Sequence, residues 1–200
     1  MNGKQMKLFL VDGTPRGLTT AEITNWTGHV LSARRSDLAE PLKREEAERT
    51  GVYRLLGEDE GALGETRCYI GEADVVATGL RSHVRDKPFW NQVVVITSKN
   101  TNLTKSHGKY LESRLIELGT QAGRVTLANG CAPPMPRLPE ANASDMEYFL
   151  KAAPDPLGDG TVTNDISLDE ILRSAPGPDL DGGIELSDEE FASFIKAVRG

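Results

Sequence analysis

Two tripeptides in this sequence place a tyrosine and a glycine two positions apart, in opposite orders: Gly51-Val52-Tyr53 and Tyr69-Ile70-Gly71. The Gly- and Glu-rich segment 57–65 between them is typical of a hairpin turn. If that turn is symmetric about Gly61, Tyr53 lies opposite Tyr69 and Gly51 opposite Gly71, and all four face one side of the sheet. Two phenols beside two bare backbone positions predict a small open platform.

The elements that must position these groups alternate between strands and helices over residues 51–130. Residues 74–86 place Val76, Leu80 and Val84 four apart, which predicts a helix with one apolar face. Four aliphatic residues in succession predict a strand within 90–97 that is buried on both faces. Thr104 can cap a helix that ends near residue 122, and 124–127 reads as a short last strand. This order predicts an α+β fold.

Further polar groups follow in a fixed order: Leu80-Arg81-Ser82-His83, then His107-Gly108-Lys109-Tyr110-Leu111-Glu112, then Asn129-Gly130. Together with the two tripeptides they resemble the GIY-YIG nuclease family, and residues 6–50 resemble an extension carried by a bacterial branch of it. The resemblance covers Met6 to Ala153. It implies a small three-stranded sheet flanked by helices, with N-terminal accessory strands.

This resemblance implies a metal-dependent endonuclease that hydrolyses DNA phosphodiester bonds. It assigns Tyr53 to water activation, Tyr69 to orientation of the phosphate or the water, and Glu112 to one divalent cation, Mg²⁺ or Mn²⁺. His83 and Asn129 belong to the same expected catalytic set, Asn129 through a supporting hydrogen bond. A phenol with the ordinary pKa of ~10 is a poor base at neutral pH, so a nearby cation would have to lower the pKa of Tyr53.

One position departs from the family pattern, because the family's arginine falls at Gly79, four residues before His83. Arg81 is the obvious substitute in the catalytic set, yet residues two apart on a helix point ~200° away from each other. Arg81 can therefore act only if Gly79 breaks or rewinds the helix. Loss of a transition-state cation slows phosphoryl transfer by ~10² to 10⁵-fold. The alternative is thus a catalytically inactive module of the same fold that binds nucleic acid or protein.

Basic residues around the hairpin and the two helices are the candidate contacts to DNA: Arg54, Arg85, Lys87, Lys105 and Lys109. They form no dense basic stripe, which favours a transient, metal-dependent encounter over a stable grip. Each candidate also has a purely structural interpretation. Tyrosines are common in half-buried strands, Glu112 can simply pair with Lys109 or Lys105, and most surface lysines are only solvated.

Charge divides the chain into a nearly neutral body and an acidic tail. The formal net charge is −7, but residues 154–200 hold 11 acidic and 3 basic residues, against 19 and 20 in the rest of the chain. We therefore expect a GIY-YIG-like domain at 51–131, preceded by an accessory segment at 1–50 that contains a weakly amphipathic helix at 36–49. A linker and packing helix would occupy 132–153.

The tail, residues 154–200, is expected to be partly disordered, with three interpretations left open. It can be a solubilising segment, it can dock on the body's cations or on a partner, or it can be a degenerate calcium loop. For the last, Asp179, Asp181, Ser187 and Glu190 have the right spacing, but Ile184 replaces the required glycine.

The remaining composition excludes several classes of protein. Two cysteines, Cys68 and Cys131, make neither a disulfide framework nor a zinc site. No apolar run approaches the ~20 residues of a membrane span, and the first ten residues lack the order of a signal peptide. We expect a cytoplasmic protein without membrane contact.

Overall fold

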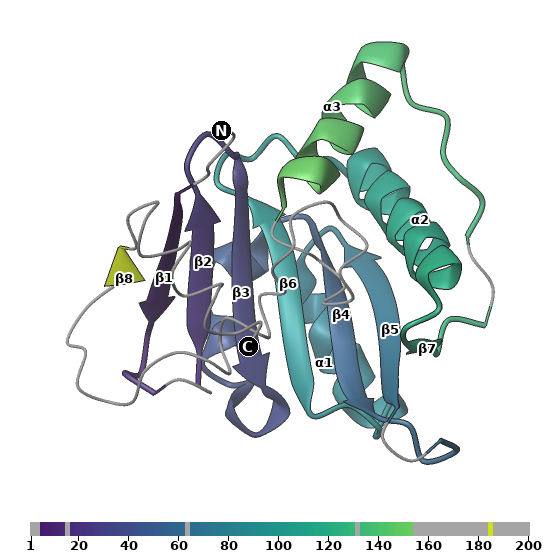
Figure 1. The fold of residues 1–200 in the computed structure, drawn as a ribbon. Helices are drawn as coiled ribbons and strands as arrows, with labels where there is room; N and C mark the ends of the chain where they lie inside the picture. Colours follow the sequence, from purple (N-terminus) through teal and green to yellow (C-terminus); the bar gives the residue numbers. More distant parts are fainter. Residues whose placement is uncertain (1–4, 15–16, 63–64, 131–132, 154–183, 186–200) are drawn as a thin grey trace, which may run out of the picture.

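The computed structural model describes residues 5–14, 17–62, 65–130, 133–153 and 184–185, and the α+β class is confirmed. Figure 1 shows its strands and helices. The strands are β1 (Met6–Leu10), β2 (Thr19–Ile23), β3 (Gly28–Arg34), β4 (Gly51–Glu58), β5 (Thr66–Ala73), β6 (Gln92–Ser98), β7 (Thr126–Leu127) and β8 (Ile184–Glu185). The α-helices are α1 (Val76–Asp86), α2 (Lys105–Ala122) and α3 (Glu140–Ala152), and short 3-10 helices span Arg35–Asp37, Pro41–Lys43 and Glu45–Glu48.

Within the described residues a single eight-stranded sheet has the order β7-β5-β4-β6-β3-β2-β1-β8. The three strands expected from the sequence, β5, β4 and β6, are therefore one part of a larger sheet. Strand β3 pairs along its whole length with β6, so the N-terminal strands extend this sheet. All neighbours are antiparallel except β5 and β7. The aliphatic run in β6 signals burial, but nothing in it tells which strand covers its second edge.

Helices cover both faces of the sheet (Figure 1). On one face α1 and the 3-10 helices enclose a core that includes Tyr53, Leu55, Leu80 and Trp90. On the other face α2 and α3 enclose a second core that includes Val52 and their own apolar residues. Side chains alternate along β4, so successive residues of this strand enter different cores.

Residues 36–49 do not form the helix expected from the sequence. Three 3-10 helices replace it, and Pro41 at the start of the second one has no backbone N–H to continue a longer helix. Arg35, which opens the segment, donates hydrogen bonds to the carbonyls of Val84, Lys87, Pro88 and Trp90. Its guanidinium also lies 4.8 Å from the centre of the Trp90 ring. Arg35 thereby fixes the end of α1 to β3.

The two helices of the other face begin and end at clear signals. Thr104 and His107 form a capping box at the start of α2, and Gly123, with φ of 64°, ends it. Helix α3 occupies the later part of the segment 132–153, where a packing helix was expected, and a hydrogen bond from Trp26 Nε1 to the carbonyl of Phe149 connects it to the sheet. In the described part of the chain, no helix is both long and apolar enough to cross a membrane.

Candidate functional site

The two tyrosines share one face of the β4–β5 hairpin, but not in the predicted register. Tyr53 pairs with Gly71, and Tyr69 pairs with Leu55. The predicted pairs Tyr53–Tyr69 and Gly51–Gly71 are therefore wrong by two residues, because the turn is centred one residue later than assumed. The side chain of Asp59 accepts from the backbone N–H of Gly61 and shapes that turn. A shift of two residues keeps both phenols on the same face.

Gly71 makes room for the ring of Tyr53. A Cβ atom at position 71 would lie 2.8 Å from both Cζ and the hydroxyl oxygen of Tyr53, which is closer than real Cβ contacts. Tyr53 is only 4% exposed, whereas Tyr69 is half-buried. The glycine of one tripeptide and the tyrosine of the other are thus one packing unit.

Helix α1 lies over this unit and adds an imidazole. A Cβ at Gly79 would lie 3.0 Å from the hydroxyl oxygen of Tyr53. One turn later, the ring centroid of His83 is 5.8 Å from that of Tyr53 and 4.9 Å from that of Tyr69, the second pair in an edge-to-face arrangement. We call Tyr53, Tyr69 and His83 the aromatic cluster.

Polar side chains close the edge of β5 beside the cluster. Asn129, which follows β7, accepts from the backbone N–H of Ile70 at 3.0 Å and donates to its carbonyl at 2.8 Å. Glu112 of α2 accepts a hydrogen bond from the backbone N–H of Glu72. The negative charge of Glu112 raises the pKa of both tyrosines, which places it near the aromatic cluster.

Glu72 and Glu112 form a carboxylate pair. Burial and the neighbouring charge of Glu72 raise the pKa of Glu112 to about 7. The Oε2 atom of Glu72 is buried and has no hydrogen-bond partner among the described residues. This carboxylate lies over Gly108, one turn before Glu112, where an added Cβ would be 3.5 Å from Oε2. The charges of Lys109 and Lys105 act on this carboxylate pair, but neither forms a hydrogen bond to Oε2 of Glu72.

The aromatic cluster is uncharged at neutral pH. The pKa of Tyr53 is raised mainly by burial and further by the charges of Tyr69, Glu112 and Glu72. The pKa of Tyr69 is raised by burial and by the charge of Glu112. Burial, together with the positive charge of Lys87, lowers the pKa of His83. The cluster thus presents two hydroxyl donors and one neutral imidazole.

Arg81 is not brought to this place. Helix α1 runs without interruption through Gly79, so the break or rewinding that Arg81 would need is absent from this described helix. Gly79 faces Tyr53, and Arg81, ~200° further round the axis, is exposed to solvent.

The five predicted DNA contacts lie in different environments. Lys87, directly after α1, places its ammonium nitrogen 3.9 Å from the centre of the Tyr69 ring. Arg85 and Lys109 are exposed, and Lys105 pairs with Asp74 at 2.8 Å. Arg54 is 3% exposed between Val52 and Leu56 on the strand, so its position does not suit the predicted contact with DNA. The prediction was based on the positive charge of Arg54, whereas its position in the alternation of side chains along β4 indicates burial.

Glu112 and Glu72 are the described residues at this place that could hold a divalent cation. No group of three or more His, Cys, Asp or Glu that could hold a metal exists in the described part of the chain. Mg²⁺, however, is commonly bound through one or two carboxylates plus water and substrate phosphate. Glu112 and Glu72 supply two carboxylates, and the unpartnered Oε2 of Glu72 would gain a partner. Sequence reasoning missed Glu72, although an acid directly after Tyr69-Ile70-Gly71 on a strand was a usable signal.

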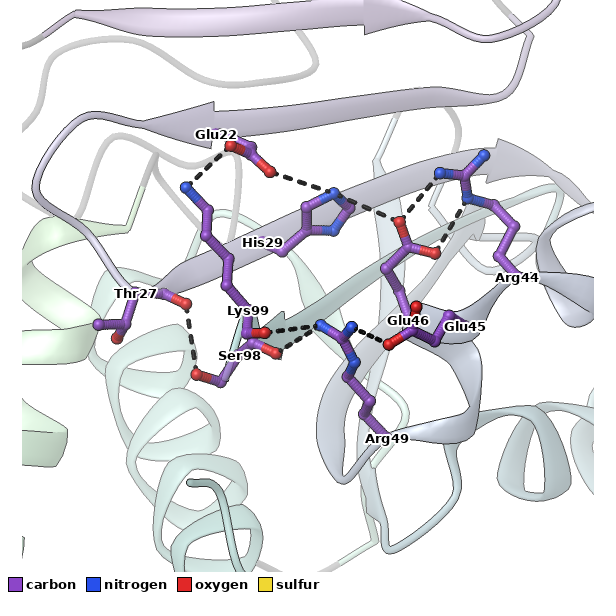
Figure 2. A network of polar contacts seen from close by, with 9 residues as sticks. All are labelled: Glu22, Thr27, His29, Arg44, Glu45, Glu46, Arg49, Ser98 and Lys99. Atoms are coloured by element: carbon purple, nitrogen blue, oxygen red, sulfur yellow. Dashed lines mark hydrogen bonds and ion pairs between the residues drawn. The ribbon is translucent and has the colours of Figure 1, made fainter. Parts of the chain in front are cut away.

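A second polar cluster lies on the sheet face that carries α1, further toward the N-terminal strands (Figure 2). Nε2 of the buried His29 is 3.8 Å from Glu22 and 3.6 Å from Glu46. Lys99 pairs with Glu22, and Arg44 with Glu46. Together with two further side chains these groups line a cavity of about 520 Å³, formed by Glu22, His29, Arg44, Glu45, Glu46, Arg49 and Lys99. Each cation here already has a carboxylate partner, so we assign the network to structure.

Comparison with known proteins gives relatives without a stated activity. The chain is 30% identical over 94 residues to an uncharacterized protein of Mycobacterium bovis and to uncharacterized proteins of two strains of Mycobacterium tuberculosis. The aligned part covers 97% of each relative and 46% of this chain. No family model matches the chain, and no solved structure matches it.

Proposed function

The chain belongs to the family of these mycobacterial proteins, and we propose that it is a metal-dependent endonuclease that hydrolyses DNA phosphodiester bonds at the aromatic cluster. The observation that supports the proposal is the packing of two phenols and an imidazole on one face of the β4–β5 hairpin, with the Glu112 carboxylate bonded to the backbone of β5 at Glu72. The order of these residues along the chain also resembles the GIY-YIG nucleases.

Each group has a role that suits its protonation state. Tyr53 and Tyr69 keep their protons at neutral pH; the half-buried Tyr69 donates a hydrogen bond to a phosphate oxygen, whereas Tyr53, 4% exposed, packs beneath Gly79. Neutral His83 accepts the proton of the attacking water. Because its pKa is raised, Tyr53 suits this task less well than the resemblance implies. Asn129 holds the backbone of Ile70 and so supports Tyr69 from the neighbouring position.

Glu112 and Glu72 would hold the divalent cation. A bound Mg²⁺ or Mn²⁺ would neutralise phosphate charge and lower the pKa of a coordinated water. Glu112 needs its carboxylate form for this task, and its raised pKa means that binding of the cation competes with binding of a proton.

The test is nicking of supercoiled plasmid in the presence of Mg²⁺ or Mn²⁺. We expect slow nicking by the wild-type protein and none by Glu112→Gln. Glu117→Gln, which changes an exposed carboxylate on the same helix, is the matched control and should nick like the wild type. Equal nicking by the wild type and Glu112→Gln would show a contaminating nuclease and overturn the proposal.

A second candidate is a catalytically inactive module that binds nucleic acid or protein. Two observations favour it: position 79 carries no cation, and Tyr53 is almost fully buried beneath that position. Retention of DNA by a protein that never nicks it, with either metal, would support this candidate over the endonuclease.

A further inference from the structure

A phosphate placed on the aromatic cluster would meet strong negative charge. Glu112 bonds the backbone of β5 at Glu72, the Glu72 side chain lies against Gly108 of α2, and the charges of both raise the pKa of Tyr53, whereas the phenols and the imidazole carry no charge at neutral pH. Binding of a phosphodiester therefore requires a cation on the protein as well as the one at the carboxylates. Lys87 is the described cation that contacts a ring of the cluster.

Lys87 reaches this place through the periodicity of α1. Gly79 and His83 lie on successive turns over the tyrosines, and Lys87 follows one turn later as the residue that caps the helix. Because Gly79 has no side chain, the helix can approach Tyr53 closely. The positive charge is supplied two turns later, by Lys87. Lys87 also lowers the pKa of His83, in keeping with its position between the helix and Tyr69.

The ammonium group of Lys87 has capacity for a ligand. It lies 3.9 Å from the Tyr69 ring centroid, and no carboxylate within the described ranges forms an ion pair with it. A ring face takes up part of an ammonium group, whose three N–H donors point in different directions. Donors of Lys87 thus remain for phosphate oxygens.

The backbone of Lys87 is held in place by Arg35. The guanidinium of Arg35 donates to the carbonyl of Lys87 at 3.1 Å and to those of Val84 and Pro88 on either side. These bonds satisfy carbonyls at the end of α1 and fix the backbone from which the Lys87 side chain reaches the Tyr69 ring. The position of Lys87 is therefore built into the fold.

We propose that Lys87 is the phosphate-binding cation of the aromatic cluster, where it contacts a phosphodiester of DNA lying over Tyr69. The inference rests on the proposed function as far as the ligand is DNA. It does not require that the DNA be cleaved.

The test measures binding of a fluorescently labelled DNA oligonucleotide by anisotropy, in EDTA and in Ca²⁺, over a series of salt concentrations. We expect Lys87→Met to weaken binding about tenfold and to reduce the salt slope of log K by about 1. Lys87→Arg should restore most of both quantities, since it keeps the charge. Arg81→Met, on the opposite side of the same helix, is the matched control and should leave the slope unchanged. The melting temperature of each variant is measured as well. A role of Lys87 in stability alone would lower the melting temperature of Lys87→Met and leave its salt slope unchanged.

The outcomes separate this inference from the proposed function. An unchanged slope in Lys87→Met, or an equal loss in Arg81→Met, overturns the inference even if the wild type nicks plasmid in a Glu112-dependent way. The expected loss in a protein that never nicks supports the inference and removes the endonuclease. Absence of any DNA binding by the wild type overturns both. If Lys87→Met does not fold, Lys87→Gln carries the same measurement.

Discussion

The space beside Gly79 is limited by the hydroxyl group of Tyr53. A Cβ at this position would come within 3.0 Å of that oxygen and within 3.0 Å of the Cβ of Ala73. Such contacts are tight, so any larger residue forces Tyr53 or the helix to move. The missing arginine is thus a matter of space as well as of charge, and adding one at position 79 would not simply restore a catalytic group.

This contact predicts an energetic coupling between positions 79 and 53. Gly79→Ala gains up to ~1 kcal/mol of helix propensity but loses it to the clash with the Tyr53 hydroxyl. In a Tyr53→Phe background the contact with the hydroxyl oxygen disappears, while those with Ala73 Cβ and the ring remain, so Gly79→Ala should be more favourable there than in the wild type by ~0.5 to 1 kcal/mol. Urea unfolding of the four proteins of this cycle measures the coupling. Strict additivity would contradict the contact.

Glu112 predicts a pH-dependent change in stability. Its pKa rises from 4.5 to about 7 on folding, so between these values the folded state binds more protons than the unfolded state. The free energy of unfolding contributed by Glu112 therefore falls as pH rises through this window, by ~1 kcal/mol after allowance for its partial exposure. Glu112→Gln should gain that amount over the wild type between pH 4.5 and pH 8, and Glu117→Gln should not.

Addition of Mg²⁺ gives the complementary measurement. At pH 8 the metal should raise the melting temperature of the wild type and leave that of Glu112→Gln unchanged, because only the wild type offers the full carboxylate pair. An equal shift in both proteins would place the metal elsewhere.

Part of this site follows from residue types and part depends on distant packing. The common face of Tyr53 and Tyr69 follows from strand periodicity and survives the error in register. The register itself depends on the turn near Asp59, whose hydrogen bonds have no clear sequence signal. The role of Lys87 depends on the length of α1 and on Arg35, so the sequence marks Lys87 only as one basic residue among several.

At the scale of elements, the end of α1 depends on one half-buried guanidinium, that of Arg35. Arg35 satisfies four carbonyls at and beyond the last turn of the helix and stacks on Trp90. Helix ends leave such carbonyls without partners in the helix itself, so another group must supply the donors. Arg35 connects α1 to the strand β3, which precedes it in the chain by more than forty residues.

Arg35→Met is expected to destabilise the protein by ~2 to 3 kcal/mol, because it leaves carbonyls at the helix end without donors. Arg35→Lys should recover little of this loss, since one ammonium cannot replace a planar fork that bonds four carbonyls. In Arg35→Met, amide hydrogen exchange should become faster than in the wild type in the last turn of α1, and this increase should be larger than that in α2. A lysine variant as stable as the wild type would contradict this assignment.

Two α-helices could be predicted from local sequence patterns, and one segment could not. Helices α1 and α2 have regular apolar spacing or caps, and their bounds differ from expectation by two residues or fewer. The segment 36–49 has helix-like spacing but contains Pro41, and its conformation is decided by contacts with α1 and β6. Local pattern is a weak guide where tertiary contacts determine the backbone.

At the scale of the molecule, the N-terminal strands and the hairpin with the candidate site share one sheet. The pairing of β3 with β6 joins them, and the network around His29 connects the same two parts through side chains (Figure 2). Glu22 lies on β2, Glu46 on the third 3-10 helix, and Lys99 just after β6. Placement of the tail beyond Ala153 on this body is described only for Ile184–Glu185, which pair with β1. The predicted calcium loop and the docking of the tail lie outside the described residues.

His29 makes the stability of this joint sensitive to acid. Burial lowers the pKa of His29 below its ordinary 6.5, although the charges of Glu46 and Glu22 oppose the shift. Below pH 6.5 the unfolded chain therefore takes up a proton that folded His29 resists, so stability falls as pH decreases from 6.5 toward the folded pKa and is unaffected above it. NMR titration of the imidazole should give a pKa below 6.5, and His29→Gln should lose less stability than the wild type between pH 7.5 and pH 5. Glu22→Gln removes one opposing charge and should lower the pKa of His29 further. A measured pKa at or above 6.5 would mean that the carboxylates outweigh burial, and the joint would then be strengthened by acid.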